Sequence, residues 1–289
     1  MPLSYHLLLT ALAIVALLTP ACRAPVLPVA YTHAPPTKTL PFTYADTAGN
    51  TYLRELRRSY PIEDVTASAK TDLDRVLATL HWTHQQWSHN GSNTPSEPNA
   101  LTILAEVAEG KQYRCVEYGI VSSEALQAIG IPARVIGLKT ADVATRKVGA
   151  GHVAAEVYLR DVGKWVFLDG QFDIVPTLDG EPLSAYEFGQ AIRTRPGDVV
   201  LVDADGPVSD KRRRRYLRFV TPYLYHLDIR FDNRAGLPRE ERRLVDGKTS
   251  LMLVPRGAAR PTVFQRKSPM DYLAYTSSPA VFYAAPTQP

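Results

Sequence analysis

The 289-residue sequence has only two cysteines, no internal repeat and no apolar run long enough to cross a membrane. Two cysteines exclude a small scaffold held together by several disulfides. Hydrophobic residues make up 45% and charged residues 21% of the chain, which excludes a disordered or fibrous protein. The length is sufficient for one elaborated domain or for two.

A large excess of charge is also missing, because the formal net charge is only +4. Part of that excess lies in one run, residues 211–215. A nucleic-acid site would need further basic patches and stacking aromatic residues on the same face, and the sequence places none there. We therefore expect the run to be a solvated or structural helix face, and we predict no nucleic-acid partner.

The longest apolar run, residues 7–18, is followed by Thr19-Pro20-Ala21-Cys22. A run of this length before small residues is typical of a signal peptide, whereas a membrane-spanning helix needs about 20 apolar residues. No lysine or arginine precedes the run, which leaves a buried N-terminal helix as the alternative. We expect an exported protein with residues 1–21 as signal peptide.

Cleavage after Ala21 would make Cys22 the first residue of the mature chain, the position that is lipidated in lipoproteins. A periplasmic protein, a lipidated protein of the cell envelope and a secreted protein all remain open. A lipid on Cys22 would be its only membrane contact. Five prolines and small polar residues lie between Cys22 and Phe42, which indicates an extended tether over residues 22–41.

Removal or lipidation of Cys22 leaves Cys115 as the single thiol. A lone thiol in an oxidising compartment is either buried and inert or retained for its reactivity. Residues 115–129 carry a mostly apolar helical pattern that ends at Gly130. Cys115 is thus predicted at a helix start, where the helix dipole and unpaired N–H groups stabilise a thiolate.

The rest of the chain alternates between helical and strand patterns, and the folded domain is expected over residues 42–289. Its core would occupy residues 64–176, and the extension 177–289 would extend the sheet or cover a cleft. Helices are predicted over residues 64–87, 100–109 and 183–193, and strands over residues 132–139, 198–203, 223–231 and 251–254.

A hairpin is predicted from residues 151–159 and 164–168, joined by a polar turn around Asp161 and Gly163. If the turn residues are Asp161 and Val162, the numbers of facing residues sum to 323. His152 and Asp169 are then diagonal neighbours on one face, within roughly 7 to 8 Å of each other. A slip of one residue would place them on opposite faces.

These three residues form a combination that supports thiol chemistry. Cys115 needs a base to become a thiolate, His152 can accept the proton, and Asp169 can hold the imidazole in the useful tautomer. The backbone N–H of Cys115 could stabilise an oxyanion, and Gln112 is a second candidate donor. His81, His84 and His89 also cluster in sequence, but they do not converge on one helix face, so no metal site is expected.

Several segments resemble the core domain of the transglutaminase-like superfamily. They are Cys115-Val-Glu-Tyr-Gly, Gly130-Ile-Pro-Ala-Arg134, Gly151-His152 and Lys164-Trp-Val-Phe-Leu-Asp169. The resemblance covers about residues 100–176. It implies a papain-like α+β fold, with the catalytic cysteine at a helix N-terminus packed on an antiparallel sheet. It also implies Cys115 as nucleophile, His152 as base and Asp169 as acid, with no cofactor.

Three positions depart from the family pattern: Tyr113 replaces a small residue, Ala154 a common Trp, and Gly170-Gln171 a Pro and Thr. These changes affect the pocket wall, and therefore substrate choice. The expected substrate is a protein or peptide, and the expected reaction is peptide or amide hydrolysis through a thioester. Cross-linking by transfer to an amine and a non-catalytic binding module are the alternatives.

Overall fold

The computed structural model describes residues 29–33, 40–46 and 48–286. The predicted signal peptide and Cys22 lie outside this part of the chain. The predicted tether, residues 22–41, lies partly inside it. There the chain already packs against the folded domain before Phe42, where folded structure was expected to begin. Tyr31 is buried, and the Thr32 N–H donates to the Ser277 carbonyl at 2.7 Å. No helix in the described ranges is long and apolar enough to cross a membrane.

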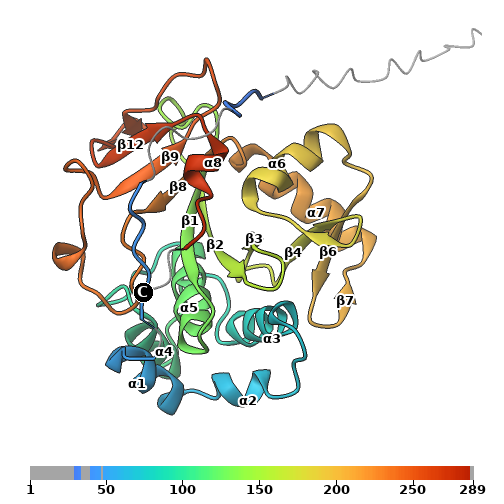
Figure 1. Ribbon diagram of the computed structural model, residues 1–289, viewed down its shortest axis with the longest axis vertical. Helices are drawn as coiled ribbons and strands as arrows, with labels where there is room; N and C mark the ends of the chain where they lie inside the picture. The colour runs from blue at the N-terminus through green and yellow to red at the C-terminus, as the bar shows by residue number, and fades with distance from the viewer. Residues whose placement is uncertain (1–28, 34–39, 47, 287–289) are drawn as a thin grey trace, which may run out of the picture.

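A six-stranded sheet forms the centre of the molecule (Figure 1). Neighbouring strands are antiparallel, except that β12 and β9 are parallel. The C-terminal extension supplies three of the six strands, so it extends the sheet, as one of the two expectations had it. The strand order is β12 (Leu273–Thr276), β9 (Ser250–Leu253), β8 (His226–Arg230), β1 (Ala133–Lys139), β2 (Gly151–Leu159) and β3 (Lys164–Leu168).

The predicted hairpin and its register are confirmed. β2 and β3 have the predicted bounds, and Ala155 faces Leu168 while Leu159 faces Lys164. Both pairs of numbers sum to 323. Regular alternation therefore places residues 152, 154 and 156 on one face of the sheet and residues 153, 155 and 157 on the other.

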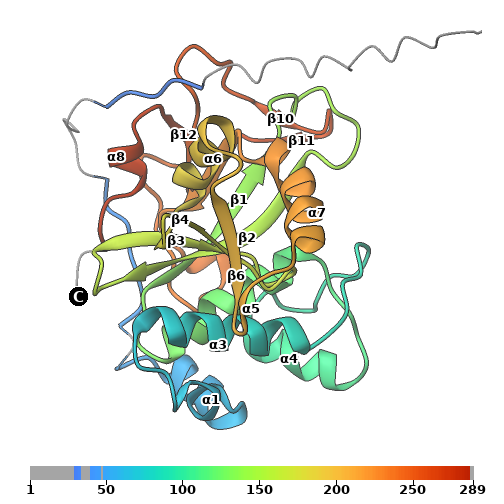
Figure 2. The same cartoon turned by 90° about the vertical axis from the view of Figure 1, so that its right-hand side faces the viewer.

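Helices from the N-terminal half gather at one end of the molecule and cover one face of the sheet (Figure 2). α5 contacts both β1 and β2, and its Leu126 joins a buried cluster with Val76 and Leu80 of α3. The helices are α1 (Thr51–Ser59), α2 (Ile62–Thr66), α3 (Asp72–Gln85), α4 (Ala100–Ala108) and α5 (Cys115–Ala128).

The single helix predicted over residues 64–87 is wrong, because α2 and α3 are separate. α3 starts at its own capping box, in which Thr71 Oγ1 accepts from the Asp74 N–H and Asp74 Oδ2 accepts from the Thr71 N–H. The apolar spacing runs through both segments, but the first helix ends at Thr66 and the second begins at Asp72, after the segment Ala67-Ser-Ala-Lys-Thr71.

The other face of the sheet is covered by the segment that follows β3 (Figures 1 and 2). A small four-stranded sheet carries two helices there, and α7 holds the basic run. The strands are β4 (Val175–Leu178), β5 (Glu181–Pro182), β6 (Val199–Asp203) and β7 (Gly206–Pro207), and the helices are α6 (Ala185–Thr194) and α7 (Asp210–Val220). The remaining elements are η1 (Thr221–Tyr223), η2 (Arg239–Glu241), β10 (Val263–Phe264), β11 (Ser268–Pro269) and α8 (Pro279–Phe282).

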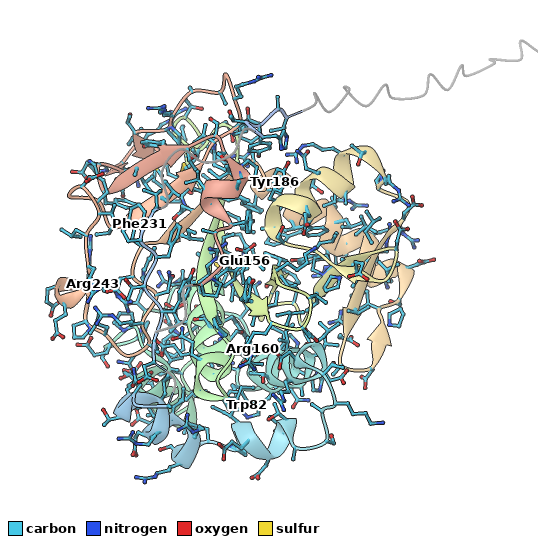
Figure 3. All side chains as sticks on the ribbon, viewed as in Figure 1. Trp82, Glu156, Arg160, Tyr186, Phe231 and Arg243 are labelled. Atoms are coloured by element: carbon cyan, nitrogen blue, oxygen red, sulfur yellow. The ribbon has the colours of Figure 1, made fainter. Side chains whose placement is uncertain are left out.

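A buried ion pair joins the central strands on this face. Arg134 of β1 and Glu156 of β2 are both fully buried, and Arg134 Nη2 donates to Glu156 Oε2 at 2.7 Å. The guanidinium also lies 3.9 Å from the centre of the Trp165 ring. Figure 3 shows Glu156 near the middle of the molecule. The arginine of the Gly130-Ile-Pro-Ala-Arg134 motif is therefore a structural residue of the core.

Candidate active site

Cys115 is the first residue of α5, and its thiol is partly exposed. The preceding Arg114 has extended backbone, and its N–H donates to Glu117 Oε2 at 3.0 Å. This contact fixes the point at which the helix begins. The predicted helix start at Cys115 is confirmed, so the thiol lies where unpaired N–H groups favour an anion.

His152 and Asp169 lie side by side at the edge of the sheet. His152 Nε2 is 2.8 Å from Asp169 Oδ2, and both side chains are almost completely buried. The diagonal arrangement across the hairpin, derived from the register, therefore brings the two side chains together. Because Nε2 is taken by Asp169, Nδ1 is the ring atom left to face Cys115, whose side chain lies close enough to act on the pKa of His152.

The charge of His152 is set by these two neighbours. Burial alone lowers the pKa of an imidazole, but the carboxylate of Asp169 and the side chain of Cys115 outweigh it and raise the pKa of His152 to about 10. The imidazolium form is thus favoured at neutral pH.

Asp169 has a second side-chain donor that the sequence reasoning missed. The hydroxyl of Tyr216, on α7, donates to Asp169 Oδ2 at 2.8 Å, and the Gln171 N–H donates to Oδ1 at 3.1 Å. Burial and the Asp169 charge raise the pKa of Tyr216 well above its usual value, so this hydroxyl stays protonated. A local pattern in the sequence carries no signal for a contact between residues so far apart.

Aromatic rings surround the His152 ring on the side of α7. The ring centres of Phe219, Tyr223 and Phe172 are 5.1, 6.0 and 6.1 Å from that of His152. Phe219 and Phe172 meet the imidazole edge-on. These rings limit the movement of the imidazole and keep water away from its bond with Asp169.

The loop that follows Asp169 is held by polar contacts from both sides. His84 Nδ1 is 3.2 Å from the Gly170 carbonyl, and His81 Nδ1 is 2.7 Å from Asp173 Oδ2. Arg212 of α7 donates to the Phe172 carbonyl at 2.7 Å. Part of the basic run is thus structural, while the solvent-facing side of α7 carries exposed cations, as expected: Lys211, Arg214, Arg215 and Arg218.

Two glycines allow α5 to approach the strands closely. A Cβ on Gly119 would lie 2.8 Å from the Ala154 carbonyl oxygen, and a Cβ on Gly170 would lie 2.6 Å from Ser122 Oγ. Glycine at both positions therefore lets Cys115 reach the ends of β2 and β3. Ala154, where the family often has Trp, is packed inside the core.

The groups that could donate a hydrogen bond to an oxyanion differ in their surroundings. The backbone N–H of Cys115 is one of the unpaired groups at the start of α5. Gln112 is exposed, and its carbonyl accepts from Asn93 Nδ2 at 2.8 Å. His89 is a further candidate: burial and then the charge of His152 lower the pKa of His89, so this ring lies within electrostatic reach of the site.

Among the described residues, no group of three or more His, Cys, Asp or Glu side chains is arranged to hold a metal ion. His81 and His84 both contact the loop after Asp169, as described above. Both side chains project from α3 and hold that loop in place.

Comparison with known families gives a match over residues 62–170, to the family described as the transglutaminase-like superfamily. The matched segment begins at α2 and ends one residue after Asp169. It includes Cys115 and His152 as well. No curated protein matches the sequence.

Solved structures similar to this chain include a candidate cysteine protease from Cytophaga hutchinsonii, with 18% identity, a TM-score of 0.34, and coverage of 41% of this chain and 37% of that one. Another is described as a TGase, with 18% identity, a TM-score of 0.30, and coverage of 44% and 34%. Calcium-bound LapG from Legionella pneumophila shares 15% identity with a TM-score of 0.30, and coverage of 55% and 87%. The chain spans little more than a third of the length of the first two.

Proposed function

Residues 62–170 belong to the transglutaminase-like superfamily, and from this premise we propose that the protein is a thiol-dependent enzyme that hydrolyses peptide or amide bonds. Cys115 is the nucleophile, His152 the base and acid, and Asp169 the residue that orients His152. The observation that carries the proposal is the arrangement of a helix-start cysteine beside an imidazole whose Nε2 is 2.8 Å from a buried carboxylate.

The first half of the reaction is acyl transfer to sulfur. The Cys115 thiolate attacks the carbonyl carbon, a C–S bond forms, and the electron pair of the C=O bond moves to oxygen. The N–H groups at the start of α5 stabilise this oxyanion. Nδ1–H of His152 then gives its proton to the amine, the C–N bond breaks, and a thioester on Cys115 remains.

The second half releases the acyl group. Neutral His152 accepts a proton from water, the oxygen of this water attacks the thioester carbonyl, and the C–S bond breaks to give a carboxylic acid and the Cys115 thiolate. An amine in place of water would give a new amide. Asp169 keeps Nε2–H bonded in both halves, so that Nδ1 is the atom that exchanges protons with the reactants.

Thiol-reactive peptide probes test the proposal. We expect wild-type protein to be labelled at Cys115, Cys115→Ala protein not to be labelled, and His152→Ala protein to be labelled much more slowly. The iodoacetamide rate should stay high below pH 7 in wild type and follow an ordinary thiol profile in His152→Ala. An ordinary profile in both proteins would favour a non-catalytic binding module.

A labelled amine identifies the acceptor. With a glutamine-containing protein as acyl donor, hydrolysis predicts release of ammonia without incorporation of the amine. Incorporation that depends on Cys115 would show instead that the protein is a cross-linking enzyme.

We also propose that the enzyme acts outside the cytoplasm. Support comes from the apolar run of residues 7–18 and the small residues before Cys22. Mass spectrometry of protein purified from the native host should find a mature N-terminus at Cys22, with or without a lipid. A chain that starts at Met1 in the cytoplasmic fraction would contradict export.

A further inference from the structure

A cavity of about 770 Å³ lies on the face of the six-stranded sheet that α5 covers only in part. It lies next to the start of α5, because its wall includes Val116, the residue after Cys115; Val153 also lines it, while the neighbouring His152 side chain lies on the opposite face of the sheet. The segment between β8 and β9 closes its other side, and Figure 1 shows this segment in orange, on the side of the sheet away from α6 and α7.

The floor of the cavity is formed by alternate residues of two neighbouring strands. Gly137 and Lys139 of β1 line it, as do Asp228 and Arg230 of β8, and Gly137 faces Asp228 across the two strands. Alternate residues of a strand point to the same side, so these side chains share one face. The absence of a side chain at Gly137 makes room for the Asp228 carboxylate, because a Cβ on Gly137 would lie 2.6 Å from Asp228 Oδ1.

Most of the charged groups in the cavity wall already have partners. Lys139 forms an ion pair with Asp228, and Asp232 accepts from Arg234 Nη2 at 2.7 Å. Arg242 donates to main-chain carbonyl groups of the surrounding loop. These groups neutralise one another or hold the loop in place. They therefore have few hydrogen-bond donors or charges left for a ligand.

Arg230 and Arg239 are different. Within the described part of the chain, neither guanidinium has a hydrogen bond or an ion pair, although both line the cavity and both are exposed to solvent. Although the Arg230 side chain reaches solvent, desolvation by the surrounding protein lowers the pKa of Arg230; the charge of Glu124 opposes this shift, and the positive charge of Arg239 adds to it. The two cations therefore lie within electrostatic reach of each other, and the charges of Glu124 and Asp232 act on Arg230 through space, without a hydrogen bond to its guanidinium.

The acids without partners lie elsewhere. Glu97 lines the cavity from the loop before α4, and Glu240 from η2, and both are exposed. Neither belongs to the strand floor, where Lys139 and Asp228 cancel and Arg230 leaves a positive charge. The floor is thus cationic, while the rim carries both signs.

We propose that this cavity is a subsite that binds a carboxylate of the substrate through Arg230 and Arg239. The carboxylate belongs either to an Asp or Glu side chain or to the C-terminus of a peptide. The inference rests on the proposed function, since it makes the cavity part of the surface that presents a peptide to Cys115. A planar guanidinium matches a carboxylate with two parallel hydrogen bonds, and a bound anion would relieve the repulsion between the two arginines.

Four thiol-reactive peptides test the subsite. They share one epoxysuccinyl group and differ in having Glu or Gln at one position and a free or amidated C-terminus. We expect at least one carboxylate to speed the labelling of Cys115 by about 10-fold or more, the effect of one charge-assisted hydrogen bond. Comparison of the four rates shows which carboxylate is bound.

The preference should disappear in Arg230→Gln and Arg239→Gln proteins, while the fully neutral peptide labels them at the wild-type rate. Arg256→Gln is the matched control, because Arg256 is exposed and does not line the cavity. It should keep the preference. Equal labelling rates for all four peptides in wild type would overturn the subsite. If Arg230→Gln fails to fold, Arg239→Gln still carries the comparison.

Binding to Cys115→Ala protein separates the subsite from the chemistry. Calorimetry with non-reactive Glu and Gln peptides should give tighter binding of the Glu peptide, or of the free C-terminus, and no difference in Cys115→Ala/Arg239→Gln. Such a result without any labelling of wild-type Cys115 would disprove the proposed enzyme and keep the subsite. The opposite result would be labelling that depends on His152 but proceeds at the same rate with and without a carboxylate, together with equal affinities for the Glu and Gln peptides. It would disprove the subsite and keep the proposed enzyme.

Discussion

The carboxylate of Asp169 accepts hydrogen bonds from three separate parts of the chain: the ring of His152, the hydroxyl of Tyr216 and the N–H of Gln171. In the proposed reaction, only His152 of the two side-chain donors exchanges protons with a substrate. Tyr216 acts through Asp169, so we regard it as a positioning residue. It holds Oδ2 in place while the charge of His152 changes during the reaction.

Replacement of Tyr216 by Phe removes this hydrogen bond and keeps the ring. We expect the rate of Cys115 alkylation at pH 7 to fall by roughly 10-fold, because a hydrogen bond to a charged group contributes on the order of 1.5 kcal/mol or more. The pH at which the rate rises should shift as well, which a purely structural role would not produce. Tyr158→Phe, at the far end of β2, is the control and should leave both rate and profile unchanged.

The charge of His152 makes stability depend on pH. The pKa of His152 is raised from 6.5 to about 10 in the folded protein, so the folded state holds a proton that the unfolded chain has lost above about pH 6.5. The contribution of His152 to the free energy of unfolding is complete below this pH and is lost as the pH rises towards the folded-state pKa of about 10. Urea unfolding at pH 6, 8 and 9.5 should therefore show a steeper loss of stability in wild type than in His152→Gln, and parallel curves would contradict the raised pKa.

At the scale of elements, the contact between α5 and β2 determines whether Cys115 can reach His152. Helix-interior Gly→Ala substitutions normally stabilise a protein by roughly 0.5 to 1 kcal/mol. At Gly119 the sign should be reversed, because the added Cβ would lie 2.8 Å from a backbone oxygen that cannot move aside. We expect Gly119→Ala to destabilise the protein by about 1 to 3 kcal/mol and to slow labelling of Cys115.

Gly189 of α6 offers the comparison for thermal unfolding. The atom that a Cβ on Gly189 would approach most closely is at the end of the flexible Arg193 side chain. Gly189→Ala should therefore change the midpoint temperature of thermal unfolding little. A Gly119→Ala protein as stable as wild type would mean that the close approach of α5 to β2 is not required.

Local patterns predicted these elements well where burial alternates regularly. The β2–β3 hairpin has the predicted bounds and register because each strand has one face fixed by core packing, and a slip would expose that face. The division between α2 and α3 was missed because apolar spacing continues across it, and only the Thr71–Asp74 cap marks the break. Nothing local in the sequence points to Tyr216, because its partner Asp169 lies 47 positions away.

On the scale of the whole molecule, the strand order shows that the predicted core cannot stand alone. β1 lies inside the sheet only because β8 covers its other edge, and β8 comes from the extension. A chain that ends at Pro176 would expose the β1 edge and the buried side chains of Ile136 and Leu138.

We therefore expect a protein truncated after Pro176 to aggregate or to remain unfolded. Solubility after expression and analytical ultracentrifugation measure this directly, with the same chain extended to its C-terminus as a comparison. A soluble, monomeric truncated protein with native-like circular dichroism would show that residues up to 176 fold independently.

The position of Tyr216 shows that the candidate site depends on more of the chain than the segment that matches the family. The segment shared with the family ends at residue 170, yet the hydroxyl that steadies Asp169, and the ring of Phe219 against His152, come from a helix beyond it. Part of what holds the candidate site in place thus lies outside the segment that matches the family. A substitution in α7 could change how Cys115, His152 and Asp169 behave without altering any of the three.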